Sequence, residues 1–193
     1  MKFKYEIPNI SRKKEAIEFI KEFNDYNSNI NGVGGLDRYI NDYEGWLLKL
    51  EDDYTREANE EKVPARTYFL IRIEDNKIIG MVNIRLKLNE KLMYFGRNIG
   101  YCIRPTERGK GYNKINLYLA LKMCKKYGIT NALLDVDKAN IASWRTMEAL
   151  GAKLDCEKES EMEGCDYVRF YSINVEESLE KYKEIYEPLI KIK

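Results

Sequence analysis

Apolar and polar residues follow two different periods along the chain, and these periods predict a mixture of strands and helices. Short apolar or alternating runs are typical of strands, whereas apolar residues three or four positions apart are typical of helices with one buried face. The runs predict strands over residues 2–7, 67–73, 78–88, 99–103, 132–136, 152–159 and 168–173. The helical spacing predicts helices over about residues 11–26, 39–50, 114–128, 140–150 and 175–190.

The order of these elements predicts an α/β (α+β) fold in which helices cover a mixed sheet. The order is β-α-α-β-β-β-α-β-α-β-β followed by one helix, so strands alternate with helices only in the middle of the chain. Residues 27–35 are polar and glycine-rich, and we expect a mobile loop there. Residues 51–62 are a charge run, expected at a solvated helix end, and the last two strands are expected to pair around Glu163 and Gly164.

The composition indicates one globular domain that spans residues 1–193. Hydrophobic residues make up 44% of the chain and charged residues 34%, which is typical of a folded soluble protein. The 33 basic and 32 acidic residues leave a net charge of +1, so we expect no nucleic-acid or membrane partner. No stretch approaches transmembrane length and no apolar signal core opens the chain, which predicts a cytoplasmic protein.

Residues that commonly bind metals are scarce in this sequence. The chain has no histidine, and its four cysteines, Cys102, Cys124, Cys156 and Cys165, form no Cys-x-x-Cys pair. We therefore expect no metal site, and the cysteines support no disulfide framework.

The stretch from Asn98 to Asn113 has the clearest chemical signal. An apolar run over residues 99–103 ends at Arg104-Pro105, and the basic turn Arg108-Gly-Lys-Gly111 leads into a helical pattern. A strand, a glycine-bearing turn and a helix start bring free backbone N–H groups and the positive end of a helix dipole together. Such a place favours phosphate. The plainer alternative is a tight turn with a solvated basic face.

Three familiar motifs do not fit this turn. The Walker A loop requires Gly-Lys followed by Ser or Thr, and the dinucleotide-binding fingerprint requires a third glycine. An RNA-binding RNP1 segment needs aromatic or apolar residues where Lys110 and Asn113 stand, and it lies on a strand.

The turn does resemble a known family. Arg108-Gly-Lys-Gly111-Tyr-Asn113 resembles motif A of the GNAT superfamily of N-acetyltransferases, with asparagine where glycine or alanine is usual. Asp137-Lys-Ala-Asn140-Ile-Ala-Ser143, followed by Gly151, resembles the start of the family's asparagine-bearing helix. The similarity covers about residues 63–154 and extends to a predicted-acetyltransferase branch of bacterial GNAT proteins.

The resemblance implies a fold and a ligand. It implies a GNAT-like, mostly antiparallel central sheet with helices on both faces and a C-terminal helix, in which strands 99–103 and 132–136 splay apart. The slot between them would take the pantetheine arm of acetyl-CoA as co-substrate. The residues expected to bind it are Cys102, Ile103, Arg108, Gly109, Lys110, Gly111, Tyr112, Asn113, Asn140 and Ser143.

The catalytic residues are harder to assign by resemblance. The backbone N–H near Ile103 is the expected donor to the thioester oxygen. Methionine at 147 stands where the family usually has its acid tyrosine, and neither Arg97 nor Asn98 can replace the usual base. Three possibilities remain open. In the first, water or an amine that is already neutral meets the need for proton transfer. In the second, a residue such as Tyr101 or Asp135, with Tyr94 and Asp137 as further candidates, reaches the site and transfers the proton. In the third, the protein binds acetyl-CoA and transfers poorly.

The resemblance implies acetyl transfer to an amine by direct attack in a ternary complex. The acceptor site should be built by the first two helices and residues 27–35, against residues 90–97. A small-molecule amine and a peptide amine are both compatible with the sequence, as are a monomer and a homodimer. The alternative function is an acyl-CoA-binding sensor or interaction protein with weak or no catalysis.

Overall fold

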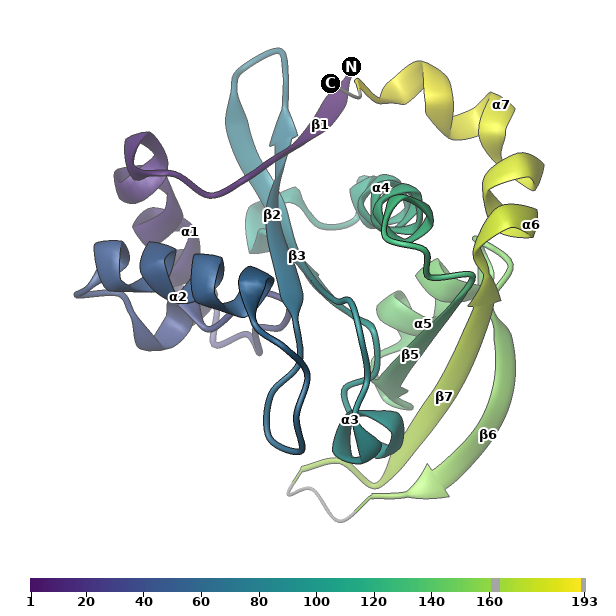
Figure 1. Cartoon of the computed structure of the whole chain (residues 1–193). Coiled ribbons are helices and arrows are strands. Elements are labelled where there is room, and N and C mark those ends of the chain that lie inside the picture. The colour runs from purple at the N-terminus through teal and green to yellow at the C-terminus, as the bar shows by residue number, and fades with distance from the viewer. Residues whose placement is uncertain (161–163, 192–193) are drawn as a thin grey trace.

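The strands form two antiparallel sheets that lie side by side. The computed structural model describes residues 1–160 and 164–191. The first sheet has the order β1-β2-β3-β4, and the second has the order β5-β7-β6 (Figure 1). Their bounds are β1 Phe3–Glu6, β2 Ala65–Arg72, β3 Lys77–Arg85, β4 Ile99–Ile103, β5 Asn131–Asp137, β6 Lys153–Glu159 and β7 Tyr167–Asn174. The expected mixed α/β fold with largely antiparallel pairing is confirmed.

Helices cover both faces of the first sheet. Figure 1 shows α1 and α2 on one face and α4 on the other, with α6 and α7 outside α4. The bounds are α1 Lys13–Asp25, α2 Tyr43–Thr55, α3 Glu90–Tyr94, α4 Tyr112–Lys126, α5 Ile141–Glu148, α6 Val175–Lys181 and α7 Lys183–Tyr186. Short 3-10 turns are η1 Ile10–Arg12, η2 Leu36–Arg38, η3 Pro105–Glu107 and η4 Glu187–Leu189. Within the described ranges, none of the helices combines the length and the apolarity that crossing a membrane requires.

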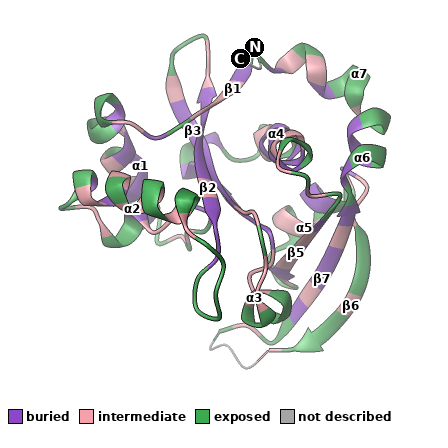
Figure 2. Ribbon diagram, in the orientation of Figure 1, coloured by how far each residue is buried: buried purple, intermediate pink, exposed green. Residues whose placement is uncertain are grey.

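The first sheet separates two hydrophobic clusters. Because side chains alternate between the faces of a strand, Phe69 packs with α1 and α2, whereas its neighbour Leu70 packs with α4. Figure 2 shows the resulting pattern, in which β2 and β3 are buried along most of their length and the helices expose their outer faces. Trp46 and Tyr43 of α2 are fully buried in the first cluster. The sheet thus has the continuous apolar character expected of a layer covered on both sides.

Two elements differ from the sequence-based expectation. Helix α3 lies between the predicted strands 78–88 and 99–103, where no helix is expected. The Asn89 side chain accepts a hydrogen bond from the Leu92 N–H at 3.0 Å and so caps it. The predicted C-terminal helix is present but breaks at Tyr182 and ends in a 3-10 turn, because Pro188 has no N–H to continue the helical ladder. The expected turn at Glu163 lies outside the described residues.

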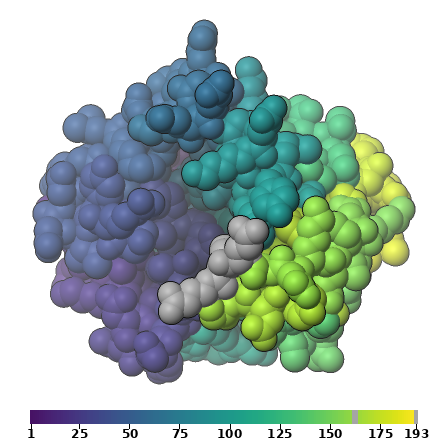
Figure 3. Space-filling model, turned by 90° about the horizontal axis from the view of Figure 1, so that it is seen from below, coloured from purple at the N-terminus to yellow at the C-terminus, as the bar shows by residue number. Residues whose placement is uncertain are grey.

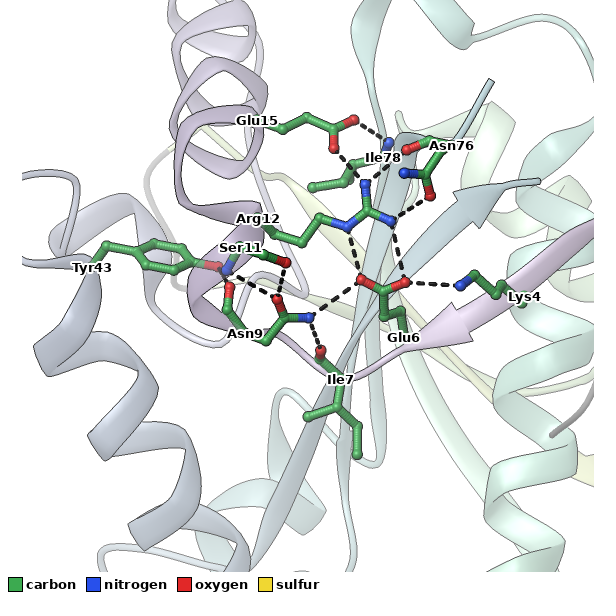
Figure 4. Close-up of polar contacts among 10 residues, drawn as sticks. All are labelled: Lys4, Glu6, Ile7, Asn9, Ser11, Arg12, Glu15, Tyr43, Asn76 and Ile78. Carbon is green, nitrogen blue, oxygen red and sulfur yellow. Dashed lines mark hydrogen bonds and ion pairs between the residues drawn. The ribbon is translucent and has the colours of Figure 1, made fainter. Parts of the chain in front are cut away.

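A polar network fixes α1 against the first sheet (Figure 4). The Arg12 guanidinium donates to Glu6 at 2.8 Å and to the Asn76 carbonyl at 2.8 Å, so it joins the β1–α1 link to the β2–β3 turn. The hydrogen bond from Arg12 lowers the pKa of Glu6 to about 2. The Tyr43 hydroxyl donates to the Asn9 carbonyl at 3.0 Å and ties α2 to the same link. The α1–α2 pair is therefore anchored at the end of the sheet remote from α3.

Candidate functional site

Strands β4 and β5 meet at one residue and belong to different sheets. The Asn98 N–H donates to the Leu133 carbonyl, and the Asn98 side-chain oxygen accepts from the Leu133 N–H, both at 2.9 Å. The Asn98 amide also donates to the Arg85 carbonyl at 3.1 Å, so this buried side chain holds β3, β4 and β5 together. Past Asn98 no ladder joins β4 to β5 in the described part of the chain. The splay that the family resemblance implied is present.

The edge of β4 that faces away from β3 has N–H groups with no hydrogen bond to a described residue. Arg104 donates its N–H to the Ile79 carbonyl, and the Asn98 carbonyl accepts from Arg85, so even-numbered residues of β4 bond to β3. The N–H groups of Tyr101 and Ile103 therefore point away from β3, toward the gap beside β5. The Cys102 side chain lies in the α1–α2 cluster and its backbone faces β3. The geometry thus gives no support to Cys102 as a ligand contact, whereas Ile103 is placed to donate.

The turn before α4 forms an open cradle. Gly109 and Gly111 have φ angles of +76° and +78°, and a Cβ at either position would meet no heavy atom within 4 Å. Gly111 is the N-cap of α4, and its positive φ turns the chain into the helix. The N–H groups of Arg108 and Lys114 bond to Pro105 and Gly111, whereas those between them have no hydrogen bond to a described residue. These free N–H groups can bind an anion.

A buried carboxylate underlies this cradle. Glu107, whose side chain is only 5% exposed, forms ion pairs with Arg72 at 2.9 Å, Lys77 at 3.1 Å and Lys110 at 2.8 Å. Burial alone would raise the pKa of Glu107, but the bonds from these three cations more than offset it and lower the pKa to about 2. Asp75 also pairs with Arg72, at 2.6 Å, so two carboxylates face three cations and the cluster keeps a net positive charge beside the cradle.

The side chains of Arg108 and Tyr112 contact other parts of the protein. Arg108 donates to the Ile103 carbonyl at 3.2 Å and to the Ser28 hydroxyl at 2.8 Å, so it links the end of β4 to the end of α1. The Tyr112 ring packs against Phe3 at 5.0 Å, which leaves the backbone of Tyr112 as its contribution to the cradle. The Asn113 side-chain oxygen is buried with no hydrogen-bond partner in the described part of the chain.

Residues of α5 face the gap from the other side. The Asn140 side chain accepts from the Ser143 N–H at 3.2 Å and caps α5. The hydroxyl groups of Ser143 and Tyr101 lie 3.0 Å apart, so Tyr101 reaches from β4 to α5. Burial raises the pKa of Tyr101, which keeps its hydroxyl protonated near neutral pH. Tyr101 and Ser143 thus lie together, and Tyr101 as a proton donor stays a prediction.

Asp135 faces the segment that precedes β4. Its Oδ2 accepts the Gly96 N–H at 2.7 Å. Arg85 donates to the Gly96 and Arg97 carbonyls, and burial lowers its pKa. Asp135 therefore holds the loop that leads into β4, and a catalytic role for it stays a prediction.

Sequence reasoning missed one buried polar residue that shapes the site. Asn116 of α4 is fully buried; its side-chain oxygen accepts from the Tyr5 hydroxyl at 2.8 Å, and its amide donates to the Met81 carbonyl at 3.2 Å. It therefore fixes the first turns of α4 against β1 and β3. The only signal in the sequence was an asparagine inside an otherwise apolar helical segment.

The loop between α1 and α2 packs on β4. A Cβ on Gly32, which has φ +70°, would lie 2.3 Å from the Gly100 carbonyl oxygen, so only glycine permits this approach. Val33 next to it is buried. The segment at 27–35, expected as a mobile loop, therefore forms part of the wall beside β4. Among the described residues, no three His, Cys, Asp or Glu side chains gather as a metal would require.

A sequence model described as the acetyltransferase (GNAT) family matches residues 36–152, which is more than half of the chain. A comparison with curated proteins finds no match.

Solved structures share the fold at low sequence identity. A ribosomal-protein-S5-alanine acetyltransferase from Vibrio fischeri has a TM-score of 0.67 at 16% identity, covering 90% of this chain and 94% of its own. RimJ from Mycobacterium smegmatis, in complex with CoA-disulfide, has a TM-score of 0.71 at 12% identity, with 93% and 87% covered. The spermidine/spermine N-acetyltransferase SpeG from Vibrio cholerae has a TM-score of 0.65 at 16% identity, with 93% and 98% covered.

Proposed function

Because the chain belongs to the GNAT family of acetyltransferases, we propose that it transfers the acetyl group of acetyl-CoA to an amine by direct attack. Members of this family use acetyl-CoA as the acyl donor. The observation that supports the proposal most is the open glycine cradle at the start of α4, next to the free edge of β4. The cradle is suited to a pyrophosphate, and the edge is suited to the amides and the carbonyl of the acyl-pantetheine arm.

The backbone provides most of the chemistry in this proposal. The amine nitrogen attacks the thioester carbonyl carbon, and the N–H of Ile103 or Tyr101 on the open edge stabilises the negative charge that develops on its oxygen. When the C–S bond breaks, the new amide bond is complete, the CoA thiol takes up a proton and the amine nitrogen gives one up. A thiol with a pKa of about 8.5 is a good leaving group and needs little protonation by the protein.

A covalent route through Cys102 is disfavoured by its surroundings. The side chain is buried in the α1–α2 cluster, and burial raises the pKa of its thiol to about 12. At neutral pH only a very small fraction is thiolate, the form that attacks a thioester. We therefore expect intact-mass analysis after incubation with acetyl-CoA alone to show no acetylated protein. Cys102→Ala should keep a turnover number within about twofold of the wild type, because the transfer does not pass through this thiol. Accumulation of an acetyl-enzyme that the variant lacks would contradict direct attack.

The test of the function combines binding with turnover. Calorimetry should show binding of CoA, and thiol release from acetyl-CoA should rise when the accepted class of amine is added. The panel should include N-terminal peptides, lysine-bearing peptides, polyamines and amino acids. Binding of CoA without thiol release for any amine would favour the alternative, a CoA-binding sensor. Absence of CoA binding would reject both.

A further inference from the structure

We propose that the acceptor amine carries an anionic group, which Arg97 and Lys158 bind beside the gap between β4 and β5. This inference rests on the proposed transfer to an amine and adds the chemical class of the acceptor. The site is the Phe170 cluster, which consists of Tyr94, Phe95, Arg97, Lys158 and Phe170.

The Phe170 cluster adjoins the place where the two sheets meet. Arg97 directly precedes Asn98, the residue that joins β4 to β5. Phe170 lies on β7 opposite Asp135 of β5, and its neighbour Tyr171 bonds to α5, so Phe170 points to the other face of the second sheet. From below, α3 and the ends of β6 and β7 lie next to each other at the surface (Figure 3). The cluster therefore lies beside Asn98, where the gap between β4 and β5 begins, and consists of residues from α3, the link to β4, β6 and β7.

Two cations in this cluster have no counter-ion among residues 1–160 and 164–191. The Arg97 guanidinium lies 4.7 Å from the centre of the Phe170 ring, and the Lys158 ammonium lies 5.6 Å from the same ring. Neither forms an ion pair with any carboxylate in the described part of the chain. The Nε of Arg97 is buried and has no hydrogen-bond partner among the described residues. A partly buried guanidinium with an unused donor is costly unless an anion binds it, and a ligand carboxylate or phosphate would meet that need.

The backbone of Arg97 is held in a strained conformation. Its φ is +33°, and among the described residues the other non-glycine positions with positive φ are both asparagines, which tolerate that region. Three contacts maintain it: the Arg97 N–H donates to Leu92 at 3.1 Å, Asp135 accepts from Gly96 at 2.7 Å, and Arg85 donates to the Arg97 carbonyl at 3.0 Å. Strain maintained by several contacts occurs at binding sites, where it fixes a side chain in place. Here it places the guanidinium over Phe170.

Asp135, which lies opposite Phe170 on β5, is engaged with other groups. One oxygen of Asp135 accepts the Gly96 N–H. The negative charge of Asp135 also interacts with the Arg85 guanidinium, whose pKa it raises against the larger effect of burial. Within residues 1–160 and 164–191, the cations Arg85, Arg97 and Lys158 and the carboxylate of Asp135 contact the link before β4 or the Phe170 ring. An acidic acceptor would therefore be attracted to the gap, and a polycation such as spermidine would be repelled.

Matched pairs of acceptors test this inference. Turnover is compared for glutamate and glutamine, for O-phosphoserine and serine, and for spermidine, at low salt. We expect kcat/KM to favour the acidic member of at least one pair by about tenfold or more, and the pair that shows this identifies the anion as carboxylate or phosphate. Arg97→Gln and Lys158→Gln should each remove most of that preference without changing the KM for acetyl-CoA. Lys126→Gln, an exposed lysine on α4, is the charge-matched control and should change nothing. Equal or better turnover of spermidine, or a preference that both variants keep, would overturn the proposal.

A binding measurement separates this inference from the proposed function. Calorimetry with N-acetylglutamate and N-acetyl-O-phosphoserine, in the presence of CoA, needs no turnover. If no amine is acetylated but one of these anions binds and Lys158→Gln weakens it, the anion site stands and the proposed transfer fails. If neutral amines are acetylated and neither anion binds, the transfer stands and the anion site fails. Because Lys158 is exposed, its variant should fold normally, and the result does not depend on the strained position at Arg97.

Discussion

Replacement of Gly111 by glutamate should abolish measurable binding of acetyl-CoA, with a Kd at least about 100-fold higher than that of the wild type. The Cβ at this position points into open space in the cradle, so the new side chain would occupy the place assigned to phosphate. The new carboxylate would also accept hydrogen bonds from the free N–H groups at the start of α4, which are the donors expected to bind the pyrophosphate. Isothermal calorimetry with acetyl-CoA measures the effect directly.

The chain offers a matched control for this substitution. Gly128 stands just past the other end of α4, has a φ of +76°, and also has open space around its Cβ position. Gly128→Glu therefore introduces the same charge and a similar backbone strain, far from the cradle. We expect it to lower stability by about 1 kcal/mol, as other non-glycine residues at positive φ do, and to leave the Kd for acetyl-CoA unchanged. Wild-type affinity in Gly111→Glu would show that the turn is not the phosphate site.

Local patterns in the sequence were sufficient for most of the fold. The strands and helices were predicted because their apolar spacing is regular, and the turn before α4 because two glycines stand between a strand and a helix. Helix α3 was missed because its stability comes from the Asn89 cap, and a five-residue segment shows no clear period. The break at Tyr182 was missed because the apolar spacing continues through it, although Pro188 indicated an early end.

The site itself depends on contacts between residues far apart in the sequence, which spacing cannot reveal. Asn98 joins β4 to Leu133, and Tyr101 reaches Ser143 across 42 positions. Nothing in the sequence distinguishes Glu107, whereas the fold buries it among cations from β2 and β3. The identity of the strand edge with free N–H groups follows only from the register with β3.

Replacement of Glu107 by glutamine should lower the free energy of unfolding by about 3 kcal/mol at pH 7, because the neutral amide leaves its cations without a buried counter-ion. The value lies at the low end for a broken buried ion pair, since Lys77 and Lys110 are partly exposed and can be hydrated. Urea denaturation measures the change. Glu74→Gln removes a half-exposed carboxylate that pairs with the chain's N-terminus, and it should cost less than about 0.5 kcal/mol.

The pH dependence of this difference tests its electrostatic origin. The pKa of Glu107 is about 2 in the folded protein, below the ordinary value of 4.5, so its charge stabilises the fold fully above pH 4.5. That contribution is lost as the pH falls from 4.5 toward 2, and the wild type and Glu107→Gln should then approach the same stability. A difference that stays constant over this range would mean that the amide disturbs packing and that the lost charge is unimportant. The substitution also frees Lys110 beside the cradle, so affinity for acetyl-CoA should be equal or higher in the folded variant, even though the variant is less stable.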